Sequence, residues 1–558
     1  MFPLDATYFS QLFASSQWVI YLVISLANGV LLYFSSLKFL LVLQLSGYRG
    51  RRYFRWLSNR DTPYLSRLML LCLLGFLFFA VLTMCFSQVV GYTVASYIGL
   101  FSYVLFTVAY INTESSVNAK VPLKKTRRLV RLAITYILFL SALTFGLITL
   151  FNYIAFVSKN QVVSLLRYSL ICAMPILTPY VLYVASLINR PFEAIVYRYY
   201  IRKAKQKIDS VNVLKIGVTG SYGKTTVKEI LKTLLSQKYR VLATPESYNT
   251  PLGIALTAKN LDETHDIFIA EMGARSVGDI KELAKLVKPK YGILTGINSQ
   301  HLETFKTKEN VKKTKFELFE NLAQDGVGFF SADDKDCVEL YEKHSGEKIL
   351  AGVNGFDLGV FATDIEITNK GTNFVLHIRG EEPFPCSTVL LGKHSISNIC
   401  LAVSVAHRIG LSTEEIAQGI NRIKSVGHRL ELMPNNKNIV IIDDSYNSNF
   451  NGVVASMEVL KVFEGRKIVL TPGLVELGKE ENIANFEMGK LLATVADKVI
   501  IIGKHNAVML INGLVEAGFD RSNIKFAKNL KKGNETLNEM LEEGDVVLFE
   551  NDLPDNYN

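Results

Sequence analysis

The chain has 558 residues, of which 49% are hydrophobic and 20% are charged, and 61 Lys and Arg against 51 Asp and Glu give a formal net charge of +10. This composition excludes an intrinsically disordered chain and argues against a wholly soluble one, and the length predicts three or four domains. Six cysteines without a CxxC spacing exclude a disulfide framework and a zinc ribbon, so we interpret the thiols as reduced and structural.

Apolar residues are concentrated in the first third of the chain. A bilayer is crossed by about 20 apolar residues. Five stretches are long enough, and we place them near Gln17–Leu37, Leu68–Phe86, Val90–Ile111, Leu129–Phe151 and Leu165–Leu187. The first has no Lys or Arg ahead of it and no small-residue cleavage site after it, so a removable signal peptide is the weaker interpretation. We therefore predict a membrane domain with five transmembrane helices over residues 1–205.

Basic residues occupy every second connection of this domain, after the first, third and fifth stretches. They are Arg49, Arg51, Arg52, Arg55, Arg60, Arg67, Lys120, Lys124, Lys125, Arg127, Arg128, Arg190, Arg198, Arg202, Lys203, Lys205 and Lys207. The intervening connections are poor in charge. By the positive-inside rule the N-terminus lies outside and everything after Asn189 lies in the cytoplasm. The predicted location is the cell membrane, with multiple passes.

The basic segment Tyr48–Trp56 has two interpretations. It could grip the pyrophosphate of a lipid-linked substrate, or it could only set the topology, with its aromatic residues at the level of the lipid headgroups. The second interpretation is favoured. No Asp, Glu or His lies inside a predicted span, so nothing indicates a proton relay or an ion path.

From about Ile208 the pattern changes to buried strands that alternate with helices. Runs such as VLKIGVTG and DIFIAEMG are each followed by a helical pattern, and a second such block begins near Asn438. This alternation is typical of βαβ units with a parallel sheet. We predict two α/β domains, a central ATP-binding domain over residues 206–427 with a parallel sheet and a Rossmann-like domain over residues 428–558.

The strongest local motif is GVTGSYGKTT, which follows a predicted strand at Leu214–Val218 and opens a predicted helix at Lys224–Leu235. Glycines let backbone N–H groups close on phosphate oxygens, and the helix N-terminus adds its positive end. Lys224 can reach the β- and γ-phosphates, and Thr225 can ligate Mg²⁺. We therefore predict an ATP site formed by Gly220, Ser221, Tyr222, Gly223, Lys224, Thr225 and Thr226.

This loop resembles the GxxGxxGKT variant of the Mur ligase superfamily, and the chain from about Val213 to Phe549 is most similar to the MurF class, the UDP-MurNAc-tripeptide–D-Ala-D-Ala ligases. Further motifs match in order: TPESYNTPLG, FIAEMGA, INSQHLETF, KKTKFELF, GKHSISNICLA, HRLEL and IDDSYNSN. The resemblance implies an ADP-forming, ATP-dependent carboxylate–amine ligase of cell wall or peptidoglycan-like biogenesis. Such an enzyme acts through an acyl phosphate.

The resemblance also implies a magnesium site. Glu271 stands where the family has a magnesium-binding glutamate, and His301 where it has a second metal-associated residue. Lys315 aligns with the family's carbamylated lysine, whose CO₂ adduct turns a cation into an oxygen ligand. Together with Thr225 these residues would hold Mg²⁺, and together with Lys224 they would carry the catalysis.

The lysine assignment stays open at this point, because Lys312 and Lys313 lie beside Lys315. A solvated basic helix face is the alternative for the whole cluster. Lys315 is favoured over Lys312 and Lys313 only by the resemblance, because its position before FELF aligns with the family's lysine.

Three more residues are implied as nucleotide contacts. Asn398 would contact the adenine, Arg429 would reach the phosphates from the join between the two domains, and Asp444 would contact the ribose or nearby phosphates. Ser395 departs from the asparagine that the family usually has after the histidine of GKHSISN, which bears on the adenine contact.

Other departures from the MurF class bear on the substrates. The membrane domain stands in place of a soluble domain that holds the UDP end of the acceptor. Phe450 replaces the proline after the DDSYN segment, and the final LFENDLPDNYN lacks a KGSR-like segment. We expect an acceptor carboxylate on a lipid-linked or membrane-assembled envelope precursor. The amine is an amino acid or peptide, not necessarily D-Ala-D-Ala, and membrane lipids and other envelope-biosynthesis enzymes are further expected partners.

Three alternatives are weighed against this interpretation. A membrane-bound polyglutamate-type ligase is the nearest one, since it would share the nucleotide site. A noncatalytic nucleotide-binding scaffold of the envelope is disfavoured by the intact set of predicted catalytic residues. An ATP-driven transporter is disfavoured because there is no LSGGQ-like signature and the second strand ends in Glu271, not in a Walker B Asp. No feature indicates nucleic acid as a partner.

Overall fold

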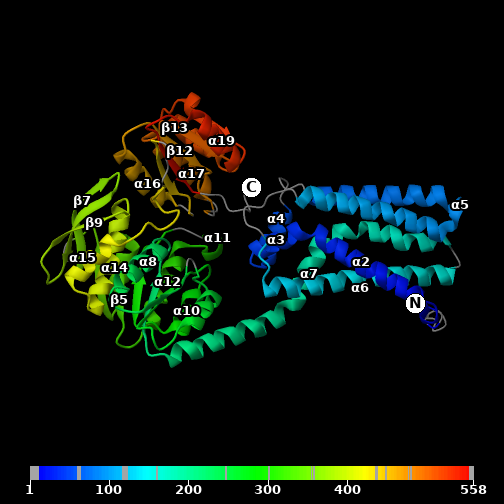
Figure 1. Cartoon of the computed structure of the whole chain (residues 1–558), viewed down its shortest axis with the longest axis horizontal. Helices are drawn as coiled ribbons and strands as arrows, with labels where there is room; N and C mark the ends of the chain where they lie inside the picture. The colour runs from blue at the N-terminus through cyan, green and yellow to red at the C-terminus, as the bar shows by residue number, and fades with distance from the viewer. Residues whose placement is uncertain are drawn as a thin grey trace. The chain divides into compact units, whose positions relative to one another are not determined.

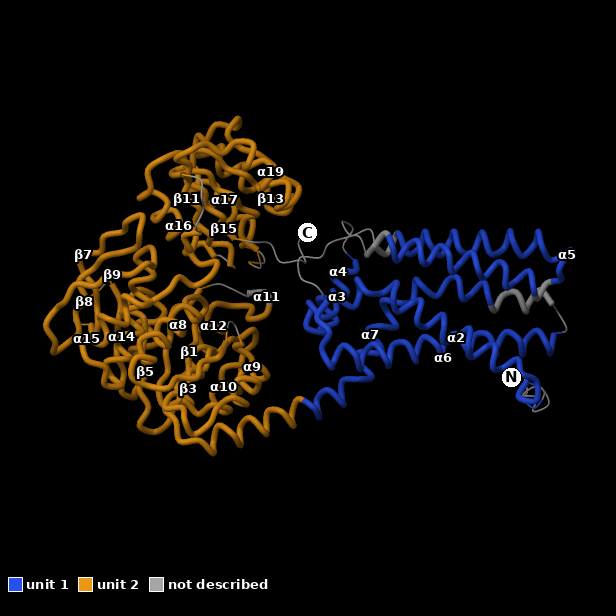
Figure 2. Tube along the Cα trace, in the orientation of Figure 1, with its two compact units in different colours: residues 1–196 blue, residues 197–558 orange. Residues whose placement is uncertain are grey.

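The computed structural model of the protein describes residues 10, 12–58, 64–115, 123–158, 161–245, 248–298, 302–353, 355, 358–433, 438–446, 449–475, 477 and 480–551. The predicted site residue His301 lies outside these residues, as do Arg60 and Lys120 of the basic connections. The chain divides into two compact units, unit 1 at Met1–Val196 and unit 2 at Tyr197–Asn558 (Figure 2).

The described part of unit 1 is helical (Figure 1). Its helices are α2 (Gln17–Ser35), α3 (Leu37–Leu45), α4 (Gly50–Leu57), α5 (Tyr64–Ser115), α6 (Arg127–Ser158) and α7 (Gln161–Ser210), the last of which ends in unit 2. Gly91 interrupts α5 with a φ of 78° and a ψ of 157°, so that α5 consists of two helices joined at a kink. This break lies between the apolar helices Arg67–Ser87 and Val94–Asn112, one residue inside the third predicted stretch.

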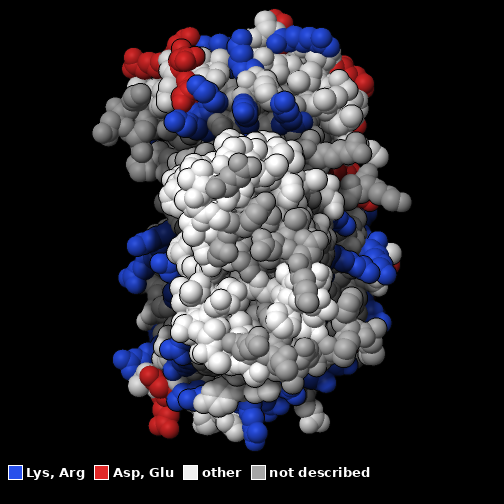
Figure 3. All heavy atoms as spheres, turned by 90° about the vertical axis from the view of Figure 1, so that its right-hand side faces the viewer, with Lys and Arg blue, Asp and Glu red and all other residues white. Residues whose placement is uncertain are grey.

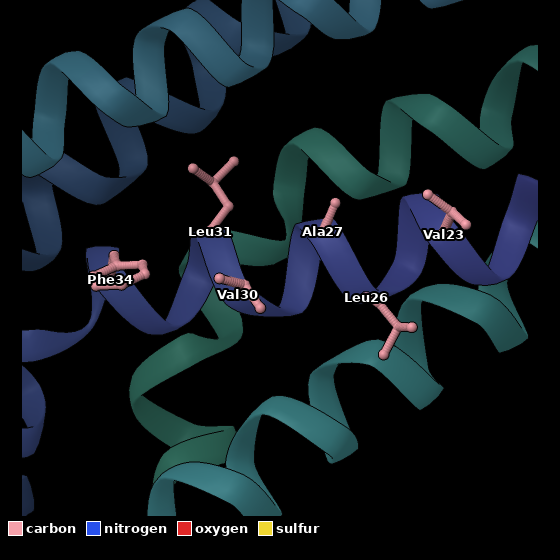
Figure 4. Close-up of a pocket in the computed structure, with 6 residues that line it drawn as sticks. All are labelled: Val23, Leu26, Ala27, Val30, Leu31 and Phe34. Atoms are coloured by element: carbon pink, nitrogen blue, oxygen red, sulfur yellow. The ribbon is translucent and has the colours of Figure 1, made fainter.

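Among the described residues, five helical segments are long and apolar enough to cross a membrane, which confirms the predicted number of apolar helices. They are Gln17–Ser35, Arg67–Ser87, Val94–Asn112, Arg127–Ser158 and Tyr168–Ser210. Much of their surface is exposed and apolar. Figure 3 shows a face of unit 1 that carries almost no Lys, Arg, Asp or Glu, and Figure 4 shows a shallow apolar pocket lined by Val23, Leu26, Ala27, Val30, Leu31 and Phe34 of α2.

Buried polar side chains connect these helices. Asn28 donates from Nδ2 to Thr144 Oγ1 at 3.1 Å and accepts at Oδ1 from the Tyr103 hydroxyl at 3.0 Å. Between α6 and α7, Arg131 makes a bidentate pair with Glu193 at 2.7 and 2.8 Å. Glu193 lies beyond the predicted fifth stretch, but within the longer apolar segment that the structure has. Such hydrogen bonds fix the register of helices whose apolar surfaces alone would not.

Unit 2 contains two sheets, and the first has nine strands in the order β2-β3-β1-β4-β5-β6-β7-β8-β9. They are β1 (Leu214–Thr219), β2 (Val241–Ala243), β3 (Ile267–Glu271), β4 (Tyr291–Leu294), β5 (Val327–Ser331), β6 (Glu347–Gly352), β7 (Val360–Thr368), β8 (Gly371–Ile378) and β9 (Phe384–Thr388). The pairs from β2 to β7 are parallel, whereas β7–β8 and β8–β9 are antiparallel.

The prediction of a purely parallel sheet is therefore wrong at this edge. Only Asn369 and Lys370 connect β7 to β8, and Thr368 pairs with Gly371 across the turn. A connection this short can only join antiparallel strands, because a parallel pair needs a crossover of a dozen or more residues. The first sheet is mixed.

Helices cover both faces of this sheet (Figure 1). They are α8 (Lys224–Leu235), α9 (Pro251–Thr257), α10 (Asp279–Val287), α11 (Leu302–Phe305), α12 (Lys308–Phe316), α13 (Lys335–Lys343), α14 (Lys393–Ile409) and α15 (Thr413–Asn421), with short 3₁₀ turns at Ala258–Asn260 and Phe319–Asn321. One apolar core joins α8, α14 and α15 to the sheet, and a second joins α9, α10, α12 and α13 to it. This three-layer arrangement is the doubly wound α/β architecture.

The second sheet has six strands in the order β10-β11-β15-β12-β13-β14. They are β10 (Glu431–Met433), β11 (Val440–Asp444), β12 (Lys467–Thr471), β13 (Lys498–Ile502), β14 (Ile524–Ala527) and β15 (Val546–Glu550), and the accompanying helices are α16 (Phe450–Val462), α17 (Glu481–Ala493), α18 (Ala507–Glu516) and α19 (Leu530–Met540), with a 3₁₀ turn at Arg521–Asn523. All pairs are parallel except β10–β11. All six cysteines lie among the described residues as free thiols, as predicted.

Candidate nucleotide and metal site

The predicted phosphate loop lies at the point where the first sheet reverses its strand order. β1 pairs with β3 on one side and with β4 on the other. From β1 the chain continues to β2 on the β3 side, whereas from β4 it continues to β5 on the opposite side. Crevices at the carboxyl ends of strands at such a point are where open α/β sheets bind ligands. The loop that joins β1 to α8 therefore occupies the expected position for a nucleotide site.

Two glycines of this loop have conformations that other residues rarely adopt. Gly220 has a φ of 153° and Gly223 a φ of 76°. A Cβ on Gly220 would lie 2.1 Å from Thr295 Oγ1, and one on Gly223 would lie 2.9 Å from Asn398 Oδ1. Gly223 is also the N-cap of α8 and supplies no side-chain cap. The amide groups of the first helical turn are thus left to bind an anion.

Lys224 folds back over the loop. Its Nζ donates to the carbonyl oxygens of Gly220 at 2.8 Å and Ser221 at 3.0 Å. Burial lowers the pKa of Lys224 to about 8, with Arg429 lowering it further and Glu271 opposing the change. A bound phosphate would offer this ammonium a stronger partner than two carbonyls do.

Glu271 lies buried at the end of β3 and is surrounded by donors. Its Oε2 accepts from Thr225 Oγ1 at 3.0 Å, and its Oε1 accepts from Asn249 Nδ2 at 3.1 Å. The Nζ of Lys228 lies 3.3 Å from Oε2. Thr225 and Glu271 are thus brought together as predicted.

Sequence reasoning missed Lys228, although its position contained a signal. It follows Lys224 by four residues and Thr225 by three, which places all three side chains on one face of a helix. Lys228 is fully buried.

The three clustered lysines of α12 have different surroundings. Lys313 is exposed. Lys312 is buried beside Glu339 and Asp336, and these carboxylates together with Glu309 raise its pKa although burial opposes this. Lys312 is therefore held as a cation.

Lys315 is only 3% exposed and makes no salt bridge with any described residue. Burial, reinforced by the charge of Lys224, holds the pKa of Lys315 well below its ordinary value, although Asp279, Glu317 and Glu271 oppose the shift. Its ammonium therefore gives up a proton more readily than that of an ordinary lysine. Only a neutral amine can add CO₂ to form a carbamate, so the structure distinguishes Lys315 from its two neighbours on chemical grounds.

Tyr222 connects the phosphate loop to the segment after β5 through a hydrogen bond to Asp334, a residue that sequence reasoning missed. Its hydroxyl donates to Asp334 Oδ2 at 2.7 Å, and the same oxygen accepts from the Ile297 amide at 3.0 Å. The other carboxylate oxygen caps α13 by accepting from the amides of Asp336 and Cys337. Burial and the neighbouring Asp334 raise the pKa of the Tyr222 hydroxyl, so it remains a hydrogen-bond donor. One carboxylate thus fixes both the loop and the start of a helix.

The predicted residues of the second domain lie where its chain begins. Arg429 stands between His428 and Leu430, which have left-handed φ values of 62° and 45°, and its guanidinium lies 4.7 Å from the centre of the Tyr446 ring. Burial lowers the pKa of Arg429, although Glu271 is among the charges that oppose this. Strained residues of this kind, here one on each side of Arg429, persist where the surroundings demand a particular geometry.

Asp444 ends β11 and is held by its own domain. It accepts from Ser456 Oγ at 2.7 Å and from the Leu430 amide at 3.2 Å, and burial raises its pKa. Its hydrogen bond to Leu430 fixes the strained turn that carries Arg429. Asn398, on α14, lies beside Gly223 as noted above.

The residues present fit Mg²⁺. This ion takes oxygen ligands and is usually bound through one or two carboxylates together with substrate phosphates, not by a complete protein cage. Glu271 supplies a buried carboxylate and Thr225 a hydroxyl beside the phosphate loop. Among the described residues, no group of three or more His, Cys, Asp or Glu is placed so that it could hold a metal ion. His301 is not one of the described residues.

A strained glycine loop before a helix, a lysine that can reach phosphates and a buried strand-end carboxylate define a nucleotide-dependent phosphoryl-transfer protein with a second α/β domain. A family model described as the Mur ligase middle domain matches residues 218–406, and one described as the Mur ligase, glutamate ligase domain matches residues 428–550. Together they cover more than half of the chain, and the chain belongs to the Mur ligase family. It is an ADP-forming, ATP-dependent amide ligase of cell wall synthesis.

Similar proteins agree with this assignment. The UDP-N-acetylmuramoyl-tripeptide–D-alanyl-D-alanine ligase of Bacillus subtilis is 28% identical over 350 residues, which are 62% of this chain and 74% of that protein. The Escherichia coli ligase of the same name is 29% identical over 313 residues, 55% of this chain and 68% of that protein.

Among solved structures, MurF from Acinetobacter baumannii has a TM-score of 0.58 at 25% identity, over 64% of this chain and 77% of that one. The MurF ligase of Thermotoga maritima in complex with ADP has a TM-score of 0.56 at 24% identity, over 64% of this chain and 80% of that one, and shows a shared fold.

Proposed function

We propose that this chain is a membrane-embedded ligase that adds an amino acid or a peptide to a lipid-linked or membrane-associated cell-envelope precursor. The observation that carries the catalytic part of the proposal is the buried Lys315, which has no ion-pair partner among the described residues and whose amine is within the electrostatic influence of Lys224 and Glu271. An ordinary ATP-binding scaffold would have no need of a buried lysine with a lowered pKa in the electrostatic field of its phosphate-loop lysine. The membrane part rests on the five apolar helices of unit 1.

The reaction would proceed in two transfers. A carboxylate oxygen of the acceptor attacks the γ-phosphorus of ATP, ADP leaves, and an acyl phosphate remains. The amine nitrogen then attacks the acyl carbon, the carbon–oxygen bond to phosphate breaks, and inorganic phosphate and a proton are released. The first transfer brings several anions together, so positive charge fixed beside them lowers its barrier.

Each predicted residue has a place in that scheme. Lys224 and the amides of Gly220–Thr226 would hold the phosphates, with Asn398 near the adenine and with Arg429 and Asp444 contributing from the second domain. Thr225, Glu271, His301 and a carbamylated Lys315 would hold Mg²⁺. When bound, the ion would neutralise the phosphoryl oxygens as they transfer.

The domain limits follow the same proposal, with a membrane domain at residues 1–205, an ATP-binding domain at 206–427 and an amine-delivering domain at 428–558. The N-terminus would lie outside and unit 2 in the cytoplasm. Neither family model extends to residues before 218. The relatives are named for a UDP-linked acceptor, and a membrane-bound enzyme gains most from an acceptor in the same bilayer, because confinement raises its effective concentration.

A reconstitution experiment tests this function. The full chain in lipid nanodiscs is given ATP and a mixture of amino acids, together with either membrane lipid extract or UDP-linked muramoyl tripeptide, and ADP release and the lipid-linked products are measured by mass spectrometry. We expect ADP release that requires both an amine and the lipid fraction, and a mass increase that identifies the amino acid. Lys224→Ala is the matched inactive control.

Each result bears on a separate part of the proposal. Turnover with the UDP-linked acceptor but not with lipid would contradict the lipid-linked substrate and leave the ligase intact. ADP release without any amine would contradict the ligase itself.

A further inference from the structure

Lys228 lies directly beside the proposed metal carboxylate, although the proposed reaction gives it no task. Its Nζ lies 3.3 Å from Glu271 Oε2 and 3.3 Å from Glu229 Oε1. Thr225 donates to the same Oε2 of Glu271. The lysine is fully buried, whereas Glu229 is partly exposed. A buried cation therefore contacts the oxygen that faces the threonine of the metal site.

The fixed charges around Glu271 determine how strongly the site attracts a divalent ion. The ammonium of Lys228 lies directly against Oε2 of Glu271, and Glu229, which offsets part of its charge, is on the partly exposed side. In a buried site, screening by water is weak, so an ion pair of this kind is strong. A divalent ion that approaches Glu271 Oε2 in the nucleotide-free site must therefore compete with Lys228.

Glu317 and Asp279, two carboxylates that act electrostatically on Lys315, are held in place by backbone amides. Glu317 accepts from the amides of Gly278 and Lys281, each at 2.9 Å. Asp279 accepts from the amides of Arg275 and Ser276 at 2.8 and 2.9 Å. These carboxylates are fixed by α10 and its preceding turn. The phosphates of a bound nucleotide would then supply the additional negative charge that a metal ion needs beside Glu271.

We propose that Lys228 is a positioning residue that makes divalent-metal binding depend on bound nucleotide. In the nucleotide-free enzyme its ammonium compensates Glu271 and keeps the carboxylate against Thr225. When ATP or ADP enters, the phosphates supply the negative charge that retains the metal. The ion pair between Lys228 and Glu271 thus keeps the metal ion from binding before the nucleotide does. This inference rests on the proposed role of Glu271 as a metal ligand.

Binding of Mn²⁺ tests the inference without reference to turnover, since Mn²⁺ accepts the same oxygen ligands as Mg²⁺. Electron paramagnetic resonance gives the Mn²⁺ affinity of the full chain in detergent, with and without ADP. We expect wild type to bind Mn²⁺ at least about tenfold more tightly with ADP than without it, because the phosphates add negative charge and oxygen ligands beside Glu271. In Lys228→Gln, which keeps an N–H donor and loses the charge, the nucleotide-free affinity should rise and this ratio should fall by about tenfold.

Two further variants separate charge from other effects. Lys232→Gln removes a charge from the exposed face of the same helix and should keep the wild-type ratio. Lys228→Arg keeps the charge in place and should also keep it. A wild-type ratio in Lys228→Gln would overturn the proposal, because a neutral donor would then suffice. If Lys228→Gln does not fold, a reduced ratio in Lys228→Arg would overturn it equally.

The same titration distinguishes this inference from the proposed function. If wild type binds no Mn²⁺ even with ADP present, the proposed metal site itself is contradicted. If wild type binds Mn²⁺ with ADP and Lys228→Gln does the same with an unchanged ratio, only the role of Lys228 is contradicted.

Discussion

At the scale of single residues, burial determines which of several chemically identical side chains can perform a task. Lys312 and Lys315 are both buried on α12, but among the described residues only Lys312 has carboxylates within ion-pair distance. A buried lysine with such partners stays charged, and one without them loses its proton at a lower pH. This difference supports the proposed carbamate at Lys315 over one at Lys312.

Replacement of Lys315 tests that assignment. Lys315→Ala should reduce ADP formation by about a hundredfold or more, since loss of one electrostatic stabiliser in an active site has that magnitude. A short-chain carboxylate such as acetate should restore part of the activity by occupying the vacated space. Lys313→Ala, which changes an exposed side chain of the same helix, should keep activity within about twofold of wild type. Full activity of Lys315→Ala would remove the carbamate from the mechanism.

The pH dependence of ATP use follows from the pKa of Lys224. A lysine ordinarily titrates near 10.5, but burial lowers this pKa to about 8 in the nucleotide-free chain. The charged form that binds phosphate is therefore present below about pH 8 and is lost above it. Because kcat/KM reports the free enzyme, kcat/KM for ATP should fall as pH rises through about 8. A kcat/KM that stays constant up to pH 10 would contradict the lowered pKa.

At the scale of elements, a few side chains hold the loops that carry the site. Asp334 accepts from two amides of α13, from the Ile297 amide and from the Tyr222 hydroxyl. No pattern in the local sequence links Tyr222 to a residue more than a hundred positions away. The turn at Arg429 is similar, because the Leu430 amide is fixed by Asp444 on another strand.

The role of Asp334 can be measured through stability. Asp334→Ala leaves several buried donors without an acceptor and should lower the free energy of unfolding by about 2 kcal/mol or more. It should also raise the KM for ATP, since Tyr222 loses its anchor. Asp520→Ala removes an exposed cap from a 3₁₀ turn and should cost about 0.5 kcal/mol. Equal denaturation midpoints for the two variants in urea would contradict this account.

At the scale of the whole molecule, the chain combines a helical unit whose surface is largely apolar with a unit of two α/β sheets. The Mur ligase motifs lie entirely in the second unit. The exposed side chains of the first unit, such as those around the α2 pocket, would be unfavourable in water and are suited to lipid. The distribution of apolar surface thus supports the proposed membrane location.

Cysteine labelling tests the proposed orientation. Lys125 and Ser158 are both exposed and lie at opposite ends of α6, so one of them should face each side of the membrane. In a background with Cys85→Ser, an impermeant maleimide should label Ser158→Cys in intact cells and Lys125→Cys only after the cells are opened. The reverse pattern would invert the topology, and labelling of both in intact cells would contradict a membrane-spanning α6.

Local sequence was sufficient for several parts of this protein. The helix Lys224–Leu235 was predicted with its observed limits, because a glycine turn before it and an amphipathic pattern within it are both local signals. The antiparallel edge β7–β9 was not predicted, since short strands separated by tight turns resemble the rest of an alternating pattern until their partners are known.

The sequence by itself determined the five apolar helices, the phosphate loop and the family, because each depends on residues that are close along the chain or on motifs that occur in order. Only the tertiary structure decided that Lys315 is the lysine whose pKa burial lowers, that Asp334 anchors Tyr222 and that Lys228 contacts Glu271. The physical reason is that a side chain's charge state depends on what surrounds it in space. Those surroundings are supplied by strands and helices that are distant in sequence and meet only when the sheet has formed.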